Sequence, residues 1–397
     1  MEAKWRALLV LTAARTSLGF QFQSVASVSP MLVEELGLTG ADLGTLIGLY
    51  FLPGLALALP GGALGRRFGD MRVVVAGLLL MALGGLVASL ATGFAGLAAG
   101  RLLAGTGAVL LNVLMAKMVT DWFAGQREIV LAMAIFVNSF PIGIGLAQLS
   151  LGARAAAAGW AGAFAATAGL ALLALLLLRL GYRPHPNDGA GQASAGQGGA
   201  GGPGLSLREV VLVCLAGALW GGLNGSFAVT IGFAPVFLAQ GGLSAPHSAL
   251  VVGAATWLSV ASVQAGGMLA QRRAPPALLM AAGCLGWAAA LLALGAGLGA
   301  AGLLAAGLAM GLPVGVIMAL PARALRPENR AVGMGLFYTW LYVGHAGLPP
   351  LAGWVQDATG LAAAPILAAA GFVAALPLLH AAFLLLAGRA GPGSAPR

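Results

Sequence analysis

Apolar residues along this chain gather into long stretches that are separated by short polar gaps. A helix needs about 20 apolar residues to cross the hydrocarbon core of a bilayer, and on that basis the pattern predicts twelve membrane-spanning segments. Their expected bounds are 6–28, 42–64, 72–92, 95–117, 129–150, 160–180, 208–236, 248–270, 276–296, 299–321, 331–355 and 361–386. Continuous apolar runs favour helices, because each backbone polar group must be satisfied within its own segment; a β-barrel would show short alternating strands.

The positions of the basic residues test this count. If the N-terminus is inside, seventeen of the twenty Lys and Arg residues fall in gaps on the cytoplasmic side, and only Arg154 falls outside. Such an excess of basic residues in cytoplasmic loops sets the orientation of membrane proteins. The pattern therefore predicts an all-α polytopic membrane protein with both termini in the cytoplasm. The two remaining cations, Arg15 and Arg101, lie inside apolar spans and require a separate explanation.

Composition agrees with the hydropathy pattern and excludes a soluble fold. Sixty per cent of the residues are hydrophobic and 8% are charged, whereas a soluble domain usually carries about 25% charged residues. The net charge of +9 indicates no nucleic-acid partner, because the basic residues are scattered through short loops where they face anionic lipid. We expect a multi-pass protein of a prokaryotic cytoplasmic membrane, with the bilayer as its main surroundings.

A stretch rich in Gly, Ala and Ser divides the chain after the sixth span. Residues 184–205 are expected to form a flexible cytoplasmic linker between an N-terminal half, 1–183, and a C-terminal half, 206–397. Two short similarities relate the halves. GGALGRR at 61–67 corresponds to GGMLAQRR at 266–273, about 205 residues later, and AMAIF at 132–136 corresponds to GMGLF at 333–337, about 201 residues later. Parallel repeats about an axis along the membrane normal characterise one large transporter architecture.

The loop after the second span carries a signature, GALGRRFGDMR at 62–72. It resembles the Gly-x-Leu-Ala-Asp-Arg-x-Gly-Arg-Arg motif of the major facilitator superfamily. The resemblance implies a conformational role for Gly62, Arg66, Arg67, Gly69, Asp70 and Arg72. The chain departs from the family pattern, with Arg66 at the usual Asp position and Asp70 where a basic residue is common. The bracing charge network of the family is therefore expected here only if Asp70 takes the place of that Asp.

Two further motifs support this resemblance, which covers essentially the whole chain through the two six-span halves and the central loop. In the fourth span, Arg101-Leu-Leu-Ala-Gly105-Thr-Gly107 matches the family's Arg-x-x-x-Gly-x-Gly. In the fifth span, the residues Pro141, Gly143 and Gly145 partly match a motif of antiporters. The resemblance implies two six-helix halves that alternate access to a central cavity lined by spans one, four, seven and ten. A weaker similarity, from Arg15 midway along span one to Pro30, is to the porters of small anions such as the cyanate permease-like branch.

Arg15 and Arg101 are the main candidates for binding substrate. None of the eleven Asp and Glu residues lies in the middle of a predicted span, so neither arginine has a buried carboxylate partner. A guanidinium facing a cavity suits an anion, which it can bind with two parallel hydrogen bonds. The alternative is structural: a buried arginine can instead donate to helix carbonyls or bridge the halves through water. That alternative is as strong as substrate binding for Arg101 and weaker for Arg15.

Polar groups in other spans complete the candidate site. Tyr338, Tyr342 and His345 form one stripe of the eleventh span, where His345 could couple proton movement to transport; the alternative is a neutral histidine bonded to a tyrosine or a carbonyl. Asn112 and Asn224 are amides near the centres of spans four and seven. They either hydrogen-bond to the substrate or join helices.

These features favour a secondary transporter of a small anionic solute. We expect it to be a monomer with a coupling proton or a counter-substrate as further partner. The residues expected to bind the solute are Arg15, Arg101, Asn112, Asn224, Tyr342 and His345. The alternative is a proton-coupled exporter of lipophilic compounds, although such exporters usually need a membrane-embedded carboxylate. The sequence contains no Gly-x-Ser-x-Gly, His-Glu-x-x-His or phosphate-loop motif. We therefore expect no enzymatic activity, no cofactor and no metal site.

Overall fold

The computed structural model describes residues 2–124, 126, 128–183, 205–326 and 329–388. The expected linker at 184–205 lies outside the described residues except for its last residue, Leu205. So do the side chains at positions 59, 62, 63, 66, 130, 134, 245 and 331, which include the motif residues Gly62 and Arg66. The regular structure throughout the described part is helical, which confirms the all-α prediction.

The helices follow the predicted spans in order. The first group comprises α1 Ala3–Leu36, α2 Gly40–Leu49, α3 Gly54–Phe68, α4 Asp70–Ser89, α5 Phe94–Trp122 and α6 Ile129–Gly181. The second group comprises α7 Leu207–Gln240, α8 Ala245–Gln271, α9 Pro276–Ala293, the π-helix η1 Leu294–Leu298, α10 Gly299–Met310, α11 Val314–Ala324, α12 Arg330–Thr359 and α13 Ala364–Gly388.

Proline and glycine explain where helix bounds and predicted spans differ. The second predicted span is divided into α2 and α3 just before Gly54, where Pro53 cannot donate a backbone hydrogen bond. The tenth is divided into α10 and α11 next to Pro313 in the same way. Conversely, α6 covers two predicted spans and turns at Ala158 and Gly159, where Gly159 has a φ of 68°. Glycine adopts this left-handed conformation without the penalty that a side chain would cause.

Eight stretches within the described residues are long and apolar enough to cross a membrane. Two of them hold more than one predicted span: Leu131–Gly181 contains the turn in α6, and Pro276–Ala324 runs from α9 to α11. Membrane-spanning helices are therefore established, whereas the total of twelve and the side on which each terminus lies stay predictions.

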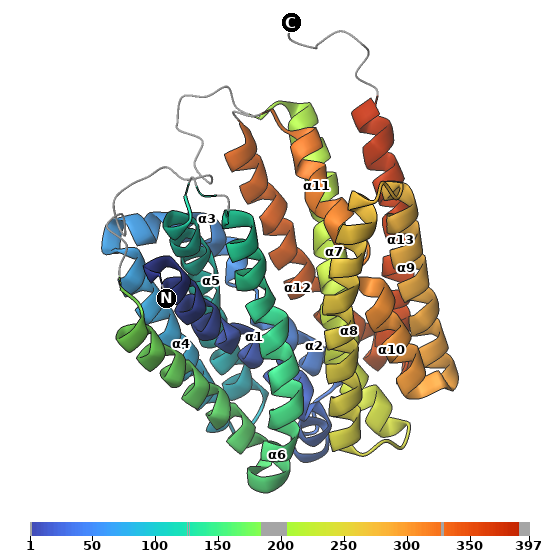
Figure 1. Cartoon of the computed structure of the whole chain (residues 1–397). Helices are drawn as coiled ribbons and strands as arrows, with labels where there is room; N and C mark the ends of the chain where they lie inside the picture. The colour runs from blue at the N-terminus through green and yellow to red at the C-terminus, as the bar shows by residue number, and fades with distance from the viewer. Residues whose placement is uncertain (1, 125, 127, 184–204, 327–328, 389–397) are drawn as a thin grey trace, which may run out of the picture.

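The helices form two groups that lie side by side (Figure 1). In the first group α1 packs along α6 and α4 packs along α5, and in the second group α7 packs along α12 and α13. The groups meet where α1 contacts α7, α2 contacts α12 and α6 contacts α8. We call these groups the N-terminal half, α1 to α6, and the C-terminal half, α7 to α13.

One end of the bundle is closed by direct contact between the halves. We call it the Gly37 end; the opposite end, next to Tyr182 and Leu205, is the linker end. At the Gly37 end, the Asp357 carboxylate of α12 accepts hydrogen bonds from the backbone N–H groups of Gly40 and Ala41, both at 2.8 Å. These are the first residues of α2, where the positive end of the helix dipole favours a carboxylate. A Cβ atom on Gly353 would collide with the backbone of Gly40, so α2 and α12 touch through their backbones.

Candidate functional site between the two halves

Arg15 is buried among α1, α5 and α6, with 8% of its surface exposed. Its Nε and Nη2 groups donate to Oδ1 of Asn112 at 3.1 and 2.7 Å. Its Nη1 group donates to Oγ of Ser139 at 2.8 Å and to the carbonyl of Phe136 at 3.2 Å. The guanidinium also lies 4.7 Å from the centre of the Phe136 ring. Arg15 therefore holds three helices together through a fork of hydrogen bonds.

The partners of Arg15 are all electrically neutral. They are an amide, a hydroxyl, backbone carbonyls and an aromatic face. Hydrogen bonds of this kind stabilise the guanidinium, but they do not cancel its charge. A buried charge without a counter-ion is costly in the membrane interior. The arrangement can therefore attract an anion to this part of the bundle.

Asn112 connects Arg15 to the other half. Its side chain lies near the hydroxyl of Tyr342 on α12. Tyr342 is 3% exposed, and a Cβ atom on Gly54 would overlap its ring. The structure thus brings three of the predicted site residues, Arg15, Asn112 and Tyr342, into one chain of contacts across the boundary between the halves.

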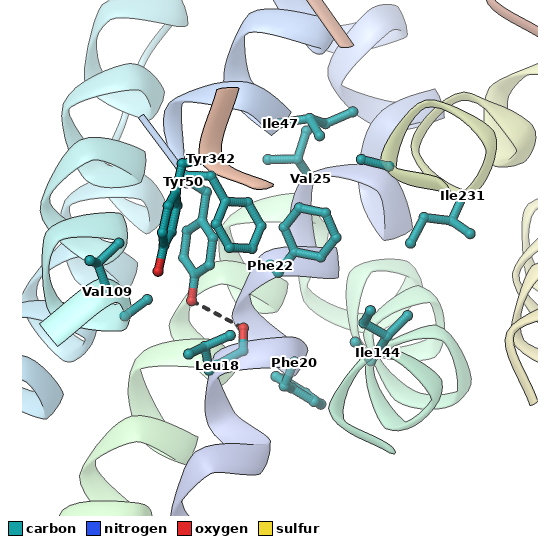
Figure 2. Close-up of a cluster of buried hydrophobic side chains, with 14 of the residues drawn as sticks. Leu18, Phe20, Phe22, Val25, Ile47, Tyr50, Val109, Ile144, Ile231 and Tyr342 are labelled. Atoms are coloured by element: carbon teal, nitrogen blue, oxygen red, sulfur yellow. Dashed lines mark hydrogen bonds between the residues drawn. The ribbon is translucent and has the colours of Figure 1, made fainter. Parts of the chain in front are cut away.

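His345 lies one turn beyond Tyr342 in an aromatic environment. Its ring centre is 4.3 Å from that of Phe51 and 5.9 Å from that of Phe22, and Figure 2 shows Phe22 and Tyr342 among the buried side chains of this region. Nδ1 donates to the carbonyl of Leu341 at 3.1 Å, while Nε2 is buried without a partner among the described residues. A neutral ring with one bare acceptor fits these contacts.

Arg101 has a different environment, deep within the N-terminal half. It is 2% exposed and donates to the backbone carbonyls of Leu46, Gln21 and Phe22 at 2.9, 2.7 and 3.2 Å. Its guanidinium lies 4.4 Å from the centre of the Tyr50 ring. Tyr50 in turn donates to the carbonyl of Leu18 at 3.0 Å, as Figure 2 shows. These contacts correspond to the structural alternative for a buried arginine, because they join α5 to α1 and α2.

Asn224 lies on α7 and is not brought into contact with Arg15. Its Nδ2 group donates to the carbonyl of Trp220, one turn earlier, at 2.8 Å. Trp220 stacks on Phe337 of α12 with ring centres 6.1 Å apart and planes at 16°. Tyr338 meets Phe337 edge to face at 5.4 Å. The C-terminal half therefore contributes aromatic surface and one amide.

Several residues that support the site were not selected from the sequence. Phe136 and Ser139 bind Arg15, yet in the sequence Phe136 stands out only as part of the repeat. The repeat itself contained a usable signal. Arg15 and Trp220 are about 205 residues apart and Phe136 and Phe337 about 201, the same separations as between the repeated segments. The repeat therefore predicts that the contact of Arg15 with Phe136 corresponds to that of Trp220 with Phe337.

The loop after the second span carries a charge cluster of its own. Asp70 is 1% exposed and accepts a 2.5 Å hydrogen bond from Lys117 on α5, which also binds Asp121 at 2.9 Å. A Cβ atom on Gly65 would collide with Asp70, so this glycine makes room for the carboxylate. The cluster joins the start of α4 to the end of α5.

The other described residues of this loop motif are two exposed arginines and a glycine at the start of α4. Arg67 is exposed and lies over Phe68 at 5.3 Å, and Arg72 is also exposed. Gly69 precedes α4 with a φ of 89°, a left-handed conformation that favours glycine.

In α6, the motif residues make room for neighbouring helices around a proline. Pro141 is half-buried inside this helix. A Cβ atom on Gly143 would collide with the carbonyl of Thr16 on α1, and one on Gly145 with Trp257 on α8. Small side chains at both positions therefore allow α6 to approach both halves.

A sequence model of the Major Facilitator Superfamily matches residues 11–349. This match covers most of the chain, and the chain belongs to that superfamily. It is therefore a membrane transporter and not an enzyme, as predicted. Among the described residues, no group of three or more His, Cys, Asp or Glu side chains is placed to hold a metal ion.

Characterised relatives resemble only part of the chain. The chain is 27% identical over 124 residues to a major facilitator superfamily multidrug transporter, mfsC, of Aspergillus fumigatus, and 33% identical over 123 residues to the cephamycin export protein CmcT of Amycolatopsis lactamdurans. It is 32% identical over 113 residues to the inner membrane transport protein YajR of Escherichia coli. These matches cover 28–31% of the chain and 24–25% of each relative's length.

Solved structures resemble the whole chain. A bacterial homologue of the human lysosomal transporter Spinster, in an inward-facing and occupied conformation, has a TM-score of 0.78 over 98% of this chain and 97% of its own, at 18% identity. The POT family transporter PepTSo has a TM-score of 0.74 over 97% of this chain and 99% of its own, at 16% identity. At these identities the likeness establishes the fold alone.

Proposed function

We propose that this chain is a secondary transporter of a small anionic solute, and that Arg15 binds the anion. One observation carries the proposal: a buried guanidinium lies at the boundary between the halves, and its described partners are all neutral. The desolvation of a charge costs several kcal/mol even after relaxation. A substrate anion offsets part of this cost, which supplies a reason for selective binding.

The other candidate residues have different parts in this proposal. Asn112 and Tyr342 orient Arg15 and complete the hydrogen bonds to the anion. Arg101 holds α5 to α1 and α2, since its donors meet backbone carbonyls in one half. Asn224 supplies an amide from the C-terminal half, and His345 responds to the movement of the halves, because its ring packs on Phe22 and Phe51 of the other half.

Alternating access gives the closed Gly37 end a role. We propose that the protein lies in the cytoplasmic membrane and crosses it twelve times. Both termini and the linker then lie in the cytoplasm. The division into residues 1–183, 184–205 and 206–397 then separates two rocking bodies and their tether. The contact of Asp357 with Gly40 and Ala41 seals the outer side, which corresponds to an inward-facing state. The protein acts as a monomer, with a proton or a counter-substrate as coupling partner.

Asp70 has a bracing role in the same proposal. The family motif places its Asp four positions earlier, where this chain has Arg66. Asp70 is buried and binds Lys117 at the linker end. It therefore braces the N-terminal half from within, between α4 and α5, and replaces the missing Asp in that limited sense.

Binding of anions to the purified protein tests the proposal. Nitrate, formate, oxalate and longer carboxylates are screened for a rise in melting temperature, because a ligand that binds only the folded state must stabilise it. For an anion that raises the melting temperature, Arg15→Gln is expected to weaken binding by about 10- to 100-fold, the effect of losing hydrogen bonds from a charged donor. Arg154→Gln is the control, since Arg154 is exposed. Equal affinity in the Arg15 variant and the native protein contradicts the assignment.

A second candidate function is proton-coupled export of lipophilic compounds. The relatives named as a multidrug transporter and a cephamycin export protein favour it, as does the aromatic surface around Trp220. In proteoliposomes, this function predicts uptake of lipophilic cations that depends on a proton gradient and survives Arg15→Gln. The anion transporter predicts that uptake of the anion is lost in the same variant.

A further inference from the structure

The C-terminal half presents a neutral aromatic surface on α7 and on α12, the helix that also carries Tyr342. Trp220 and Phe337 stack, and Tyr338 packs edge-on against Phe337. Tyr338 is 39% exposed, so part of this surface is free of protein contacts. The helices α7 and α12 that carry it have charged residues only near their ends, at Arg208, Glu209, Arg330 and Asp357.

A continuous set of contacts leads from this surface to Arg15. Tyr342 follows Tyr338 by one helical turn and lies near Asn112, which accepts two hydrogen bonds from Arg15.

We infer that the substrate is an aromatic carboxylate, with its charged group on the Arg15 side and its ring on Trp220 and Tyr338. The inference rests on the proposed function, since it takes Arg15 as the anion site and adds the body of the ligand. An inorganic anion such as nitrate would cover none of the aromatic surface. A carboxylate with a flat ring satisfies both sides, because aromatic rings bind apolar and π surfaces and a guanidinium binds carboxylates.

Four probes separate the contributions of charge and ring: 2-naphthoate, 2-naphthamide, acetate and nitrate. Dissociation constants are measured by equilibrium dialysis with the purified full-length protein. We expect 2-naphthoate to bind at least about tenfold more tightly than each of the other three, since only it offers both a ring to bury and a charge to pair.

Variants of the aromatic surface test where the ring binds. Trp220→Ala is expected to weaken 2-naphthoate by about tenfold or more and to leave acetate unchanged, whereas Trp220→Phe keeps most of the affinity. Tyr338→Ala is also expected to weaken the binding of 2-naphthoate. Because Tyr338 is exposed, folding of this variant does not depend on a buried ring. Trp354→Ala is the control, because Trp354 on the same helix is 61% exposed and lies outside the surface.

The possible outcomes distinguish this inference from the function on which it rests. If acetate or nitrate binds as tightly as 2-naphthoate, and does so only with Arg15 present, the aromatic substrate is wrong and the anion site stands. If 2-naphthamide binds as tightly as 2-naphthoate and Arg15→Gln changes neither, both proposals are wrong. Failure of 2-naphthoate to bind, or unchanged binding in both aromatic variants, also overturns the inference.

Discussion

At matching positions in the two halves, Arg15 lies over the ring of Phe136 and Trp220 stacks on the ring of Phe337. Arg15 lies in α1 and Trp220 in α7, whereas Phe136 lies in α6 and Phe337 in α12. The same backbone arrangement thus presents a cation from one half and an indole from the other. The repeat therefore preserves contacts between helices, while the side chains at those contacts have diverged.

A second pair of equivalent contacts lies at the linker end, with the charges reversed. In the N-terminal half, Lys4 of α1 donates to Gln126 at 2.7 Å and lies 3.4 Å from Glu128. In the C-terminal half, Glu209 of α7 accepts hydrogen bonds from Arg326 and Asn329. Both contacts join the start of the first helix of a half to the loop before its fifth span. Each half can therefore move as one body.

Backbone contacts between equivalent helices should show the largest effects. A Cβ atom on Gly143 would collide with the carbonyl of Thr16, and one on Gly344 with the carbonyl of Gly221. Because backbone atoms cannot rotate away, we expect Gly143→Ala and Gly344→Ala each to cost about 1–3 kcal/mol of stability. Melting temperatures in detergent measure the loss. Gly347→Ala is the control, since nothing lies within 4 Å of its Cβ position; a Gly344 variant that behaves like this control breaks the comparison.

Removal of the charge from Glu209 should have the next largest effect. Glu209 is 4% exposed, and its carboxylate accepts hydrogen bonds from Ser206, Arg326 and Asn329 at 2.9–3.3 Å. Glu209→Gln keeps the shape but leaves weaker hydrogen bonds, so we expect a loss of about 1–2 kcal/mol, limited by the exposure of Arg326. The unfolding midpoint in denaturing detergent measures it. A stability equal to that of the native protein would mean that the contact serves no clamping purpose.

The seal at the Gly37 end predicts a smaller change in conformational equilibrium. Asp357→Asn removes the charge that faces the start of α2, and we expect this to weaken the closed state by about 1 kcal/mol, or roughly fivefold in population. A cysteine introduced by Ile231→Cys, at a position that is 1% exposed, should then react faster with a maleimide that cannot cross the bilayer.

Two controls accompany this measurement. The native cysteines, Cys214 and Cys284, are first replaced. Asp42→Asn removes a carboxylate that accepts a hydrogen bond from Thr39 at the same helix start. The hydrogen bonds of Asp42 are to Thr39 and not to α12. Equal labelling rates in the Asp357 and Asp42 variants contradict the proposed seal.

The contact of Lys4 should give the smallest effect in the series. Lys4 is partly exposed and Glu128 is 44% exposed, and exposed ion pairs contribute little to stability. Lys4→Gln is therefore expected to lower the melting temperature by less than about 2 °C, clearly less than Glu209→Gln. An equal loss for the two variants would show that the halves are clamped with similar strength despite the difference in burial.

Much of the architecture could be predicted from hydropathy and charge. Every predicted span contains helix, because long apolar segments must satisfy their backbone groups internally. The internal breaks, such as that before Gly54, could not be predicted, since glycine and proline in a membrane helix indicate either a break or ordinary packing. The expected separation of 129–150 from 160–180 is confirmed, since the backbone is non-helical at Ala158 and Gly159 between the two parts of α6.

The candidate site was predictable in its members and less so in its contacts. Arg15, Asn112 and Tyr342 stood out because a polar side chain in an apolar span is costly and needs a reason. Their mutual contacts depend on residues about 97 and 230 positions apart in the sequence, and hydropathy contains no information on such pairs. Arg15 and Arg101 look alike in the sequence, yet their neighbours give them different surroundings.

The sequence by itself determined that this protein lies in a membrane, that it is helical and that its halves repeat, because these properties follow from local hydropathy and from residue spacing. The tertiary structure decided which buried cation meets the other half and which meets only backbone carbonyls. It also decided that an arginine and a tryptophan occupy equivalent places. The physical reason is that burial cost is a property of one segment, whereas the compensation of that cost depends on the groups that other helices bring near.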